Sequence, residues 1–362
     1  MVKKLSGLSP ELLIHPGETL LELTLDRGMD QKELALRTGF SAKHISKVIS
    51  GEYDITTRFA YSLETVFGVP ASFWINLQAD YDIEKMMIHS LDSVNDEEHS
   101  ILSQLSQVIS YLTNNGFMTP TRDKTQKVLM LRKILRVNNL TVIPALSIRS
   151  SFRVSNCDSI NPYVLFSWIR ICEMSAEESN AENALDAERL RNAIENIKHL
   201  MFKSEAMAME SELKKIMSEC GIRFRIVEHF RGAPVQGFIE KLDSNEILLC
   251  LTLRKAFAGI FWFTLFHEIA HIFNNDIKDR FIDFDNIKTD EEILADEFAK
   301  EVLVNTEKWN EFTSNLNFTL NALKDFAKEV NVPTFIIIER LQKEKLIPYT
   351  QYSSEKVRYK WN

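Results

Sequence analysis

The amino-acid sequence predicts a mainly α-helical protein with a small β-sheet, an α+β fold class, on three observations. Apolar residues recur at helical spacing through most of the chain. Short β-rich runs bounded by turn residues occur after Gly221, at 222–230 (IRFRIVEHF) and 246–253 (EILLCLTL). The length of 362 residues exceeds the usual size of one domain, and 45% apolar residues suffice for packed cores. We therefore expect two or three domains, with two or three strands in the last one.

Changes of pattern divide the chain into three expected parts. Residues 1–80 contain short amphipathic segments separated by glycines where helices would end, which indicates a small helical domain. Residues 81–219 form a helical middle region, rich in polar residues, Ala and Glu, that we expect to be scaffold. Residues 220–362 contain the strands, a helix from about 256, a polar break at 274–289, a helix at 290–304 and a helical C-terminal tail.

The net charge of -8, from 43 basic and 51 acidic residues, excludes a uniformly basic surface, so any nucleic-acid contact must come from a local patch. The N-terminus lacks the long apolar stretch of a secretory signal, and the longest apolar run, 256–266, is followed directly by a histidine and a glutamate. We expect a soluble, cytoplasmic protein that does not enter the membrane. The cysteines show no CxxC pairing and are expected to be reduced core residues: Cys157, Cys172, Cys220 and Cys250.

Residues 30–52 (DQKELALRTGFSAKHISKVISGE) have the pattern of a helix-turn-helix. Asp30 and Ser41 are good N-caps for two successive helices, and Gly39 can take a positive φ in the turn between them. The residues spaced to fill the core between the helices are Leu34, Ala35, Ile45 and Val48. The outer side of the second helix is then left with polar and basic residues that can enter a DNA groove.

Two groups of side chains are the candidate DNA contacts. Gln31, Arg37 and Arg58 are placed to contact phosphates, whereas Ser41, Lys43, His44 and Lys47 are placed to read bases. A helical hairpin used for packing or dimerisation is the alternative, which we rate lower. Residues 1–80 hold eight Lys or Arg against ten Asp or Glu, so useful affinity for operator DNA is expected to require a homodimer that reads two half-sites.

The segment FWFTLFHEIAHIFNN contains HExxH within an apolar helical stretch. The i, i+4 spacing puts His267 and His271 on one helix face as two nitrogen ligands for Zn²⁺. Glu268, next to the first ligand, can take a proton from a water molecule whose acidity the zinc raises, and can later pass it to a leaving amine. This is the chemistry of peptide hydrolysis.

The predicted helix at 290–304 supplies the remaining acids of this site. Glu292 and Asp296 lie one turn apart, so Glu292 is expected to be the third zinc ligand and Asp296 to hold a ligand histidine by its second ring nitrogen. Alternative third ligands are Glu291, Asp290 and Asp283. Weaker candidates for a supporting role at an oxyanion are His229, Arg231, Tyr349, Tyr352 and Tyr359. A bound but catalytically idle metal is the main competing interpretation of the motif.

Together these segments resemble an XRE-type helix-turn-helix of the HigA antitoxin kind fused to an ImmA/IrrE-type metallopeptidase domain of zincin-like fold. The segments 15–52 and 61–82 resemble the antitoxin-type module. The segments 236–255, 261–273, 291–304 and 326–349 resemble the peptidase domain and its tail. Two departures from the peptidase pattern are Ala270, where Gly is common, and Val304-Asn305, where a Met-Pro or similar pair is common.

The resemblance implies a transcriptional regulator or antitoxin that represses its own operon, with a metallopeptidase domain whose substrate in some relatives is a repressor. It implies that His267, His271 and Glu292 bind Zn²⁺ and that Glu268 is the base. Operator DNA and a protein substrate or toxin would be the partners. The alternative is a non-enzymatic antitoxin or repressor whose metal domain only binds a partner or senses a signal. A third possibility keeps the peptidase and makes the N-terminal module an adaptor for substrates or partners.

Overall fold

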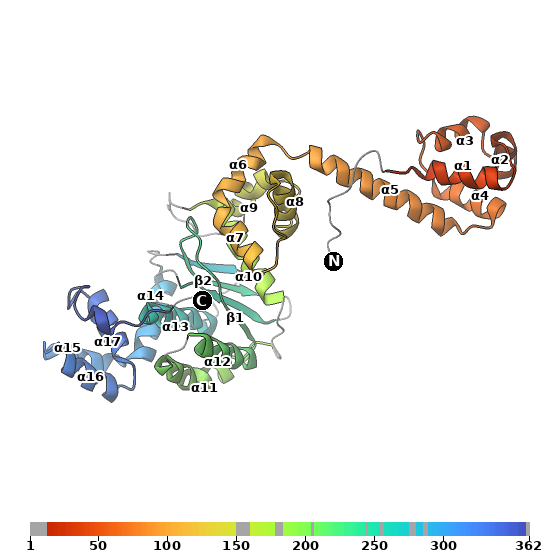
Figure 1. Cartoon of the computed structure of the whole chain (residues 1–362). Coiled ribbons are helices and arrows are strands. Elements are labelled where there is room, and N and C mark those ends of the chain that lie inside the picture. The colour runs from red at the N-terminus through yellow and green to blue at the C-terminus, as the bar shows by residue number, and fades with distance from the viewer. Residues whose placement is uncertain are drawn as a thin grey trace. The chain divides into compact units, whose positions relative to one another are not determined.

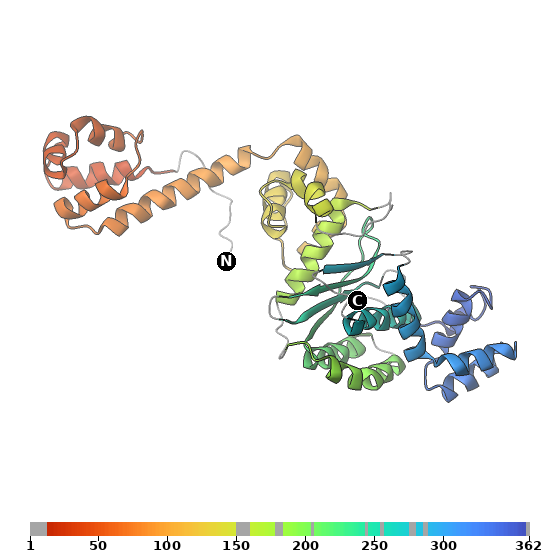
Figure 2. The same cartoon turned by 180° about the vertical axis from the view of Figure 1, so that it is seen from behind.

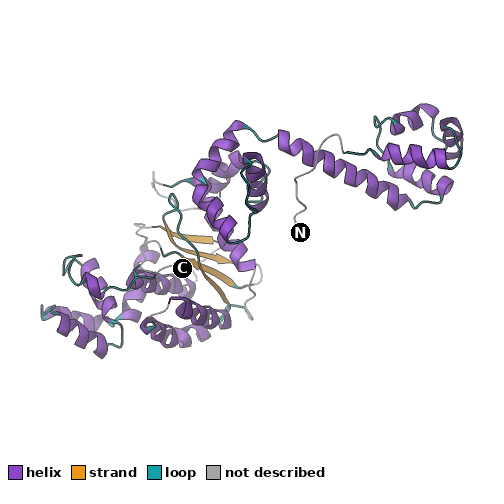
Figure 3. Cartoon of the chain, in the orientation of Figure 1, coloured by secondary structure: helices purple, strands orange, loops and turns teal. Residues whose placement is uncertain are grey.

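The chain separates into two units in the computed structural model, residues 1–99 with 121–130, and residues 100–120 with 131–362. The residues described are 13–149, 160–177, 184–203, 206–242, 245–253, 257–274, 280–284 and 289–359, with the backbone alone for 280–284. Helices dominate both units, and the strands all lie in the second, as Figure 3 shows. The α+β fold class predicted from the sequence is therefore confirmed, while the predicted boundaries near residues 80 and 219 stay predictions.

The first unit begins with five helices, α1 to α5, that Figure 1 shows in red and orange. Their bounds are Pro16–Asp26, Gln31–Thr38, Ala42–Ile49, Thr57–Phe67 and Ala71–Asp92. Side chains of Asp30, Ser41 and Thr56 cap α2, α3 and α4 by accepting backbone N–H groups, as expected of such residues. Gly39 ends α2 with a φ of 74°, which an L-residue with a side chain rarely adopts.

The core of this unit contains the four residues predicted to pack between the two helices of the helix-turn-helix. Leu34, Ile45 and Val48 are fully buried and Ala35 nearly so, and they pack with Phe59 of α4. The predicted helix-turn-helix is therefore present as α2, a turn at Gly39 and α3.

The helices that follow belong mostly to the second unit. Helices α6 to α10 span Asp96–Gln104, Ser106–Asn114, Lys124–Ile134, Ile143–Arg149 and Pro162–Glu177. Helices α11 to α14 span Ala187–His199, Ala206–Glu219, Ala258–Asn274 and Asp290–Leu303, and α15 to α17 span Thr306–Ser314, Leu320–Glu329 and Thr334–Lys343. Short 3-10 turns lie at Leu140–Val142, Leu200–Phe202 and Ser353–Glu355.

A four-stranded mixed sheet is the centre of the second unit. Its strands are β1 (Ile222–Ile226), β2 (Val235–Lys241), β3 (Ile247–Leu251) and β4 (Arg280–Phe284), in the order β1-β3-β2-β4. Strand β1 pairs with β3 in parallel, and β2 pairs antiparallel with both β3 and β4. Strand β3 is buried along its whole length, as expected for a central strand covered on both faces.

Helices cover both faces of this sheet, as Figures 1 and 2 show from opposite sides. On one face, Trp168 of α10 packs edge-on against Phe238, and Arg225 donates to the backbone oxygen of Ser175 at the end of α10. On the other face, the core joins Phe224 and Leu249 to α12 and α13. Ile239, and the residues of β2 that alternate with it on the same side of the strand, therefore face α13.

The structure corrects one element of the sequence-based description. The polar stretch 274–289, in which we expected a break, contains β4, paired with β2 over Arg280 to Phe284. Its run RFIDF has the aromatic and β-branched residues that strands favour, but polar residues on both sides obscure so short a signal. The edge of the sheet beside α13 is thus a strand that the local pattern did not reveal.

Other expectations from the sequence can be compared with the described residues. Cys172, Cys220 and Cys250 are free and buried, as predicted, whereas Cys157 lies outside the described residues. Within the described part of the chain, no helix is both long and apolar enough to cross a bilayer.

His15 links three elements of the first unit. Its Nδ1 accepts the backbone N–H of Gly17 at 2.9 Å and so caps α1, while its ring lies edge-on to Tyr81 of α5. A Cβ on Gly51, just after α3, would lie 3.3 Å from the His15 ring. Burial lowers the pKa of His15 although the charge of Asp54 acts to raise it. The folded state therefore favours the neutral ring.

The first unit is expected to become less stable in acid through His15. The pKa of His15 in the folded state is below the ordinary value of 6.5. Its contribution to the free energy of unfolding is therefore fully present above pH 6.5 and is lost as the pH falls below that value. Hydrogen exchange of α1, corrected for intrinsic rates, should accelerate from pH 7.5 to pH 5.5. His15→Asn, which keeps an acceptor that does not titrate, should flatten this dependence. His15→Ala should cost about 1 kcal/mol at pH 7.5, and less at pH 5.5, where a protonated ring no longer accepts the Gly17 N–H. An unchanged profile in His15→Asn would assign the acid response to another group.

Candidate functional site

Helix α13 carries the HExxH motif through the interior of the second unit. Its residues from Ala258 to Ile272 are apolar on nearly all sides and mostly buried, the property of a core helix rather than a surface one. His267 is 5% exposed, and Glu268 and His271 are fully buried among these apolar residues. Burying three polar side chains in such a helix is costly unless each has partners, so their surroundings decide what the helix does.

Helix α14 supplies the partners of these histidines. Thr289 caps α14 and accepts the backbone N–H of Glu292, which places Glu292 in the first turn, where the helix dipole favours a negative side chain. The atoms His267 Nε2 and Glu292 Oε2 are 3.1 Å apart, and His271 Nε2 lies 3.7 Å from Glu292 Oε1. The two histidine Nε2 atoms are 3.2 Å apart. One nitrogen or oxygen from each of the three residues can thus be chosen so that all lie within 4.8 Å of one another.

Asp296, one turn after Glu292, fixes the other side of His267. Its Oδ1 lies 3.0 Å from His267 Nδ1. When Nδ1 carries the proton and donates it to Asp296, His267 Nε2 presents a lone pair to Glu292 and His271. Burial acts to raise the pKa of Asp296, but the hydrogen bond with His267 and the charge of Lys343 hold that pKa below its usual value. The acid therefore favours this orientation of the ring.

The geometry fits a tetrahedral zinc ion. Bonds of about 2.0 Å in a tetrahedron put ligand atoms about 3.3 Å apart, close to the separations among the two histidines and Glu292. Three electron-rich atoms facing one another in a buried site repel each other unless a proton or a cation lies between them. Two imidazoles and one carboxylate form the ligand set typical of a catalytic zinc site with a fourth position open.

Glu268 lies against the sheet because of a glycine that the sequence analysis did not single out. Gly237 is two residues before Ile239 in β2, so it lies on the same side of the strand and faces α13. A Cβ built on Gly237 would lie 2.9 Å from Glu268 Cγ and would overlap the carboxylate. A lone glycine inside a strand pattern signals such a close approach, so the position could have been flagged, though not its partner.

The alternative ligands and supporting residues have other positions. Asp290 and Glu291 precede Glu292 in the first turn of α14 and are not among the ligand atoms that converge, while the side chain of Asp283 is not described. Tyr352 Oη donates to the backbone oxygen of Phe318, and Tyr359 Oη accepts from Trp262 Nε1 at 2.9 Å. These two hydroxyls serve packing of the tail. The backbone N–H of Arg231 donates to Gln107 Oε1 at 2.7 Å.

The candidate DNA contacts lie on α2 and α3. Gln31 is the first residue of α2 and is half-buried, and Lys43 of α3 is exposed. The hydroxyl of Ser41 accepts the backbone N–H of His44 at 3.1 Å, as the N-cap of α3. The ring of His44 stacks on Phe40 and meets Phe59 edge-on, and burial lowers its pKa. His44 is thus packed in an aromatic cluster, a position that its helical spacing alone did not indicate.

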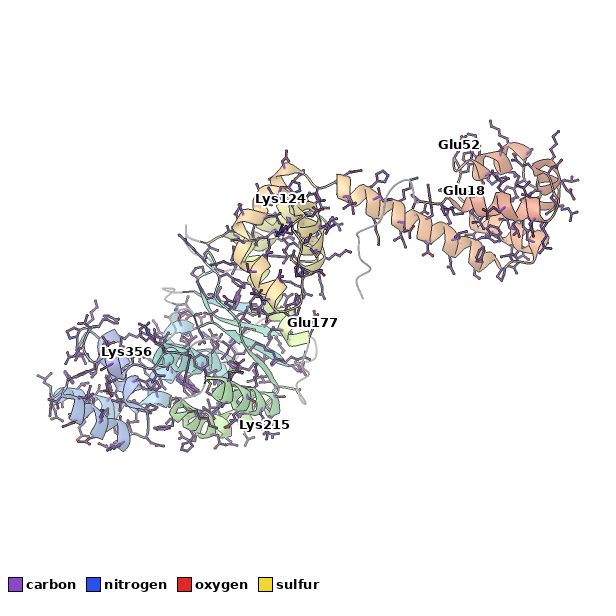
Figure 4. The ribbon with its side chains drawn as sticks, viewed as in Figure 1. Glu18, Glu52, Lys124, Glu177, Lys215 and Lys356 are labelled. Carbon is purple, nitrogen blue, oxygen red and sulfur yellow. The ribbon has the colours of Figure 1, made fainter. Side chains whose placement is uncertain are left out.

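Two basic side chains of this face have acidic partners. Arg37 donates to Glu33 at 2.6 Å, and Lys47 pairs with Glu52 at 2.9 Å, above the ring of Tyr53. Figure 4 labels Glu52 beside α3. The guanidinium of Arg58 lies 5.5 Å from the centre of the Phe40 ring. Such exposed pairs are weak, so phosphate groups can compete for the cations.

Two family models match the chain at the positions of these two sites. A helix-turn-helix model matches residues 21–74, and a model of the IrrE N-terminal-like domain matches residues 259–342. The chain is also 35% identical over 83 residues to virulence-associated protein I of Dichelobacter nodosus. The matched segment covers 23% of this chain and 76% of that protein.

Two solved structures are similar to part of the chain. One is an addiction module antidote protein of the HigA family from Coxiella burnetii, 27% identical, covering 30% of this chain and 98% of that one with a TM-score of 0.19. The other, assigned as an antidote protein of a plasmid maintenance system from Nostoc punctiforme, is 27% identical and covers 26% of this chain and 93% of that one, with a TM-score of 0.20.

Fold, site and comparisons together define a DNA-binding helix-turn-helix protein with a peptidase-like domain. The chain belongs to the XRE-type helix-turn-helix family, and its second unit carries an IrrE N-terminal-like domain of the peptidase type. The resemblance identified from the sequence motifs is confirmed.

The ligand geometry predicts that the purified protein contains about one zinc per chain. His267→Ala should lower this content sharply because it removes the central ligand, whereas His89→Ala, at an exposed position on α5, should not. Elemental analysis of the three proteins measures the effect. Zinc at the same level in His267→Ala, or none in the folded wild type, would contradict the assignment.

Proposed function

We propose that this protein is a transcriptional regulator or antitoxin that binds operator DNA, its own operator first, through α2 and α3, and that a zinc-dependent endopeptidase site in the second unit cleaves a regulatory protein. The observation that carries the proposal is the convergence of His267, His271 and Glu292 within 4.8 Å of one another, beside Glu268, in a chain with a helix-turn-helix. A protein substrate or a toxin is the expected partner, and the protein is expected to act as a cytoplasmic dimer.

The DNA part of the proposal follows from the exposed outer side of α3. Lys43, with Ala42 and Ser46 beside it, is exposed there, as are Arg37 on α2 and Arg58 on α4. Phosphate contacts would position the module, and α3 would lie in the major groove. A dimer would read two half-sites about one helical turn apart and would add the binding energies of two modules whose charge is nearly balanced.

Two substitutions on this face should change DNA affinity in opposite directions. Lys43→Ala removes a cation and should weaken binding, whereas Glu52→Gln frees Lys47 from its ion pair and should strengthen it. A plot of the logarithm of the DNA association constant against the logarithm of the salt concentration should change its slope by about 1 in each variant. The slope should become shallower in Lys43→Ala and steeper in Glu52→Gln. The measurement is titration of a labelled duplex from upstream of the chain's own gene at several salt concentrations.

Glu84→Gln is the matched control because it removes an acid at an exposed position of α5, away from α2 and α3. It should leave affinity and slope close to those of the wild type. A wild-type chain that binds this duplex no better than a scrambled one would favour a role for the module as an adaptor.

The peptidase part assigns a task to each residue of the site. A zinc ion held by His267, His271 and Glu292 would supply the Lewis acidity that makes a water molecule acidic and polarises a peptide carbonyl. Asp296 keeps the His267 ring in the orientation that binding requires. Glu268 takes the proton of the attacking water and passes it to the leaving amine.

Glu268→Gln should keep zinc, but its rate of peptide cleavage should fall by about a hundredfold to ten-thousandfold, because the amide cannot accept the proton. Gly237→Ala should also keep zinc and lower cleavage, since its methyl group displaces the Glu268 side chain. Glu297→Gln, at an exposed position of α14, is the control. Cleavage of a peptide library, read by mass spectrometry, measures all four proteins, and equal cleavage by Glu268→Gln would reject its role as base.

A second candidate function has one observation in its favour. Glu268 and His271 have no exposed surface, so in this conformation a peptide cannot reach them from solvent. A closed zinc site suits an antitoxin or repressor whose second unit only binds a partner or senses a signal. Absence of cleavage by a zinc-loaded wild type would favour this function.

A further inference from the structure

Helix α17 touches the helix that carries the two histidines through one buried acid. Glu339 Oε1 accepts the backbone N–H of Gly259 in the first turn of α13, at 3.4 Å. A Cβ on Gly259 would lie 2.6 Å from Glu339 Oε2, so a residue with a side chain at 259 would push the acid away. A negative group is favoured at this helix end, where the dipole is positive.

The next residue of α17 touches the helix that carries Glu292. Arg340 Nη1 donates to the backbone oxygens of Val304 at 3.1 Å and Lys300 at 3.4 Å, at the C-terminal end of α14. Its guanidinium also lies 4.2 Å from the centre of the Trp309 ring, and its Nε donates to Glu344. A positive group is favoured at this helix end, where the dipole is negative.

The C-terminal tail closes over the Glu339 contact. The backbone N–H of Ala258 donates to the oxygen of Val357 at 2.9 Å, and Tyr359 accepts from Trp262 of α13. Lys356, labelled in Figure 4, and Arg358 lie over the ring of Phe257, just before α13. These contacts lie beside Glu339 and contribute to its partial burial.

We infer that Glu339 and Arg340 are positioning residues that set the spacing of α13 and α14 and thereby the affinity of the site for zinc. The inference rests on the proposed zinc site and deepens it. Adjacent residues on one turn of α17 hold opposite ends of the two helices that supply all three ligands, each residue with the charge that its helix end attracts. The spacing of His267 and His271 relative to Glu292 is therefore governed from a segment that supplies no ligand.

The acid of this pair changes charge near neutral pH. Burial raises the pKa of Glu339 to about 7, although the Gly259 hydrogen bond and the charge of Lys356 act to lower it. The groups that face it are the Gly259 and Ile260 N–H groups of α13 and, from the tail, Lys356 and Tyr359. Because the folded pKa exceeds the ordinary 4.5, the ionised form costs folding free energy, and the cost grows as the pH rises from 4.5 toward 7. The ionised carboxylate nevertheless attracts the two N–H groups more strongly than the neutral acid does.

Glu339→Gln separates positioning from general stability. At pH 8 the variant should bind zinc about threefold to tenfold more weakly than wild type, while the zinc-free variant melts no lower because a buried charge is gone. At pH 6, where the wild-type carboxyl is itself largely neutral, the two affinities should converge. Protonation of the ligand histidines affects both proteins alike and cancels in their ratio. The measurement is competition for zinc with a chelator of known affinity, using the full chain, together with thermal melts followed by circular dichroism.

Arg340→Gln should weaken zinc binding at both pH values because its partner carbonyls lose a donor, and Arg340→Lys should restore part of the affinity. Glu311→Gln, at an exposed position of α15, is the matched acid control. If Arg340→Gln does not fold, Glu339→Gln decides alone. The decisive quantity is the zinc affinity of wild type divided by that of the variant. The inference would be overturned if this ratio were the same for Glu339→Gln as for Glu311→Gln at both pH values, or if the ratio for Glu339→Gln did not change with pH. A folded wild type that binds no zinc would instead overturn the zinc site on which it rests.

Discussion

The close approach of His267, His271 and Glu292 is the constraint on which the second unit depends. Their nearest atoms lie between 3.1 and 3.7 Å apart in a buried, largely apolar setting, where like partial charges are weakly screened. The helices must hold these atoms together, and a proton or a cation between them offsets the repulsion of their partial charges. The packing of α13 on β2 and β3, the Asp296 hydrogen bond and the contacts from α17 all hold the ligand-bearing helices together.

The sequence predicted the parts of this site that depend on local periodicity. The spacings of His267 with His271 and of Glu292 with Asp296 are single helical turns, so helix geometry alone places each pair on one face. The same holds for the caps Asp30 and Ser41 and for the core residues Leu34 and Ile45 of the helix-turn-helix. That α14 lies against α13 was an inference from the chemistry of the motif, and the distances between their side chains agree with it.

Contacts between distant segments were beyond the reach of the sequence. Gly237 lies in β2 and Glu268 in α13, with β3 between them in the sequence, and their contact depends on which face of β2 meets α13. Glu339 and Gly259 lie 80 positions apart, as the hydrogen bond between them records. His44 illustrates the same limit within a short motif: helical spacing placed it on the outer side of α3, but Phe40 and Phe59 provide an apolar surface on which its ring packs.

The two helix-end contacts of α17 use the same electrostatic principle as the recognition of ions by helix termini, but within the chain. A ligand of zinc must be rigid enough to lower the entropy cost of binding, and a helix is rigid only as far as its ends are anchored. Anchoring α13 with an acid whose pKa is near 7 stores unfavourable free energy in the fold, since a neutral amide of the same shape would be easier to bury. Such a cost is understandable if the charge serves the zinc site, because the ionised carboxylate holds the first turn of α13 more strongly than a neutral group would.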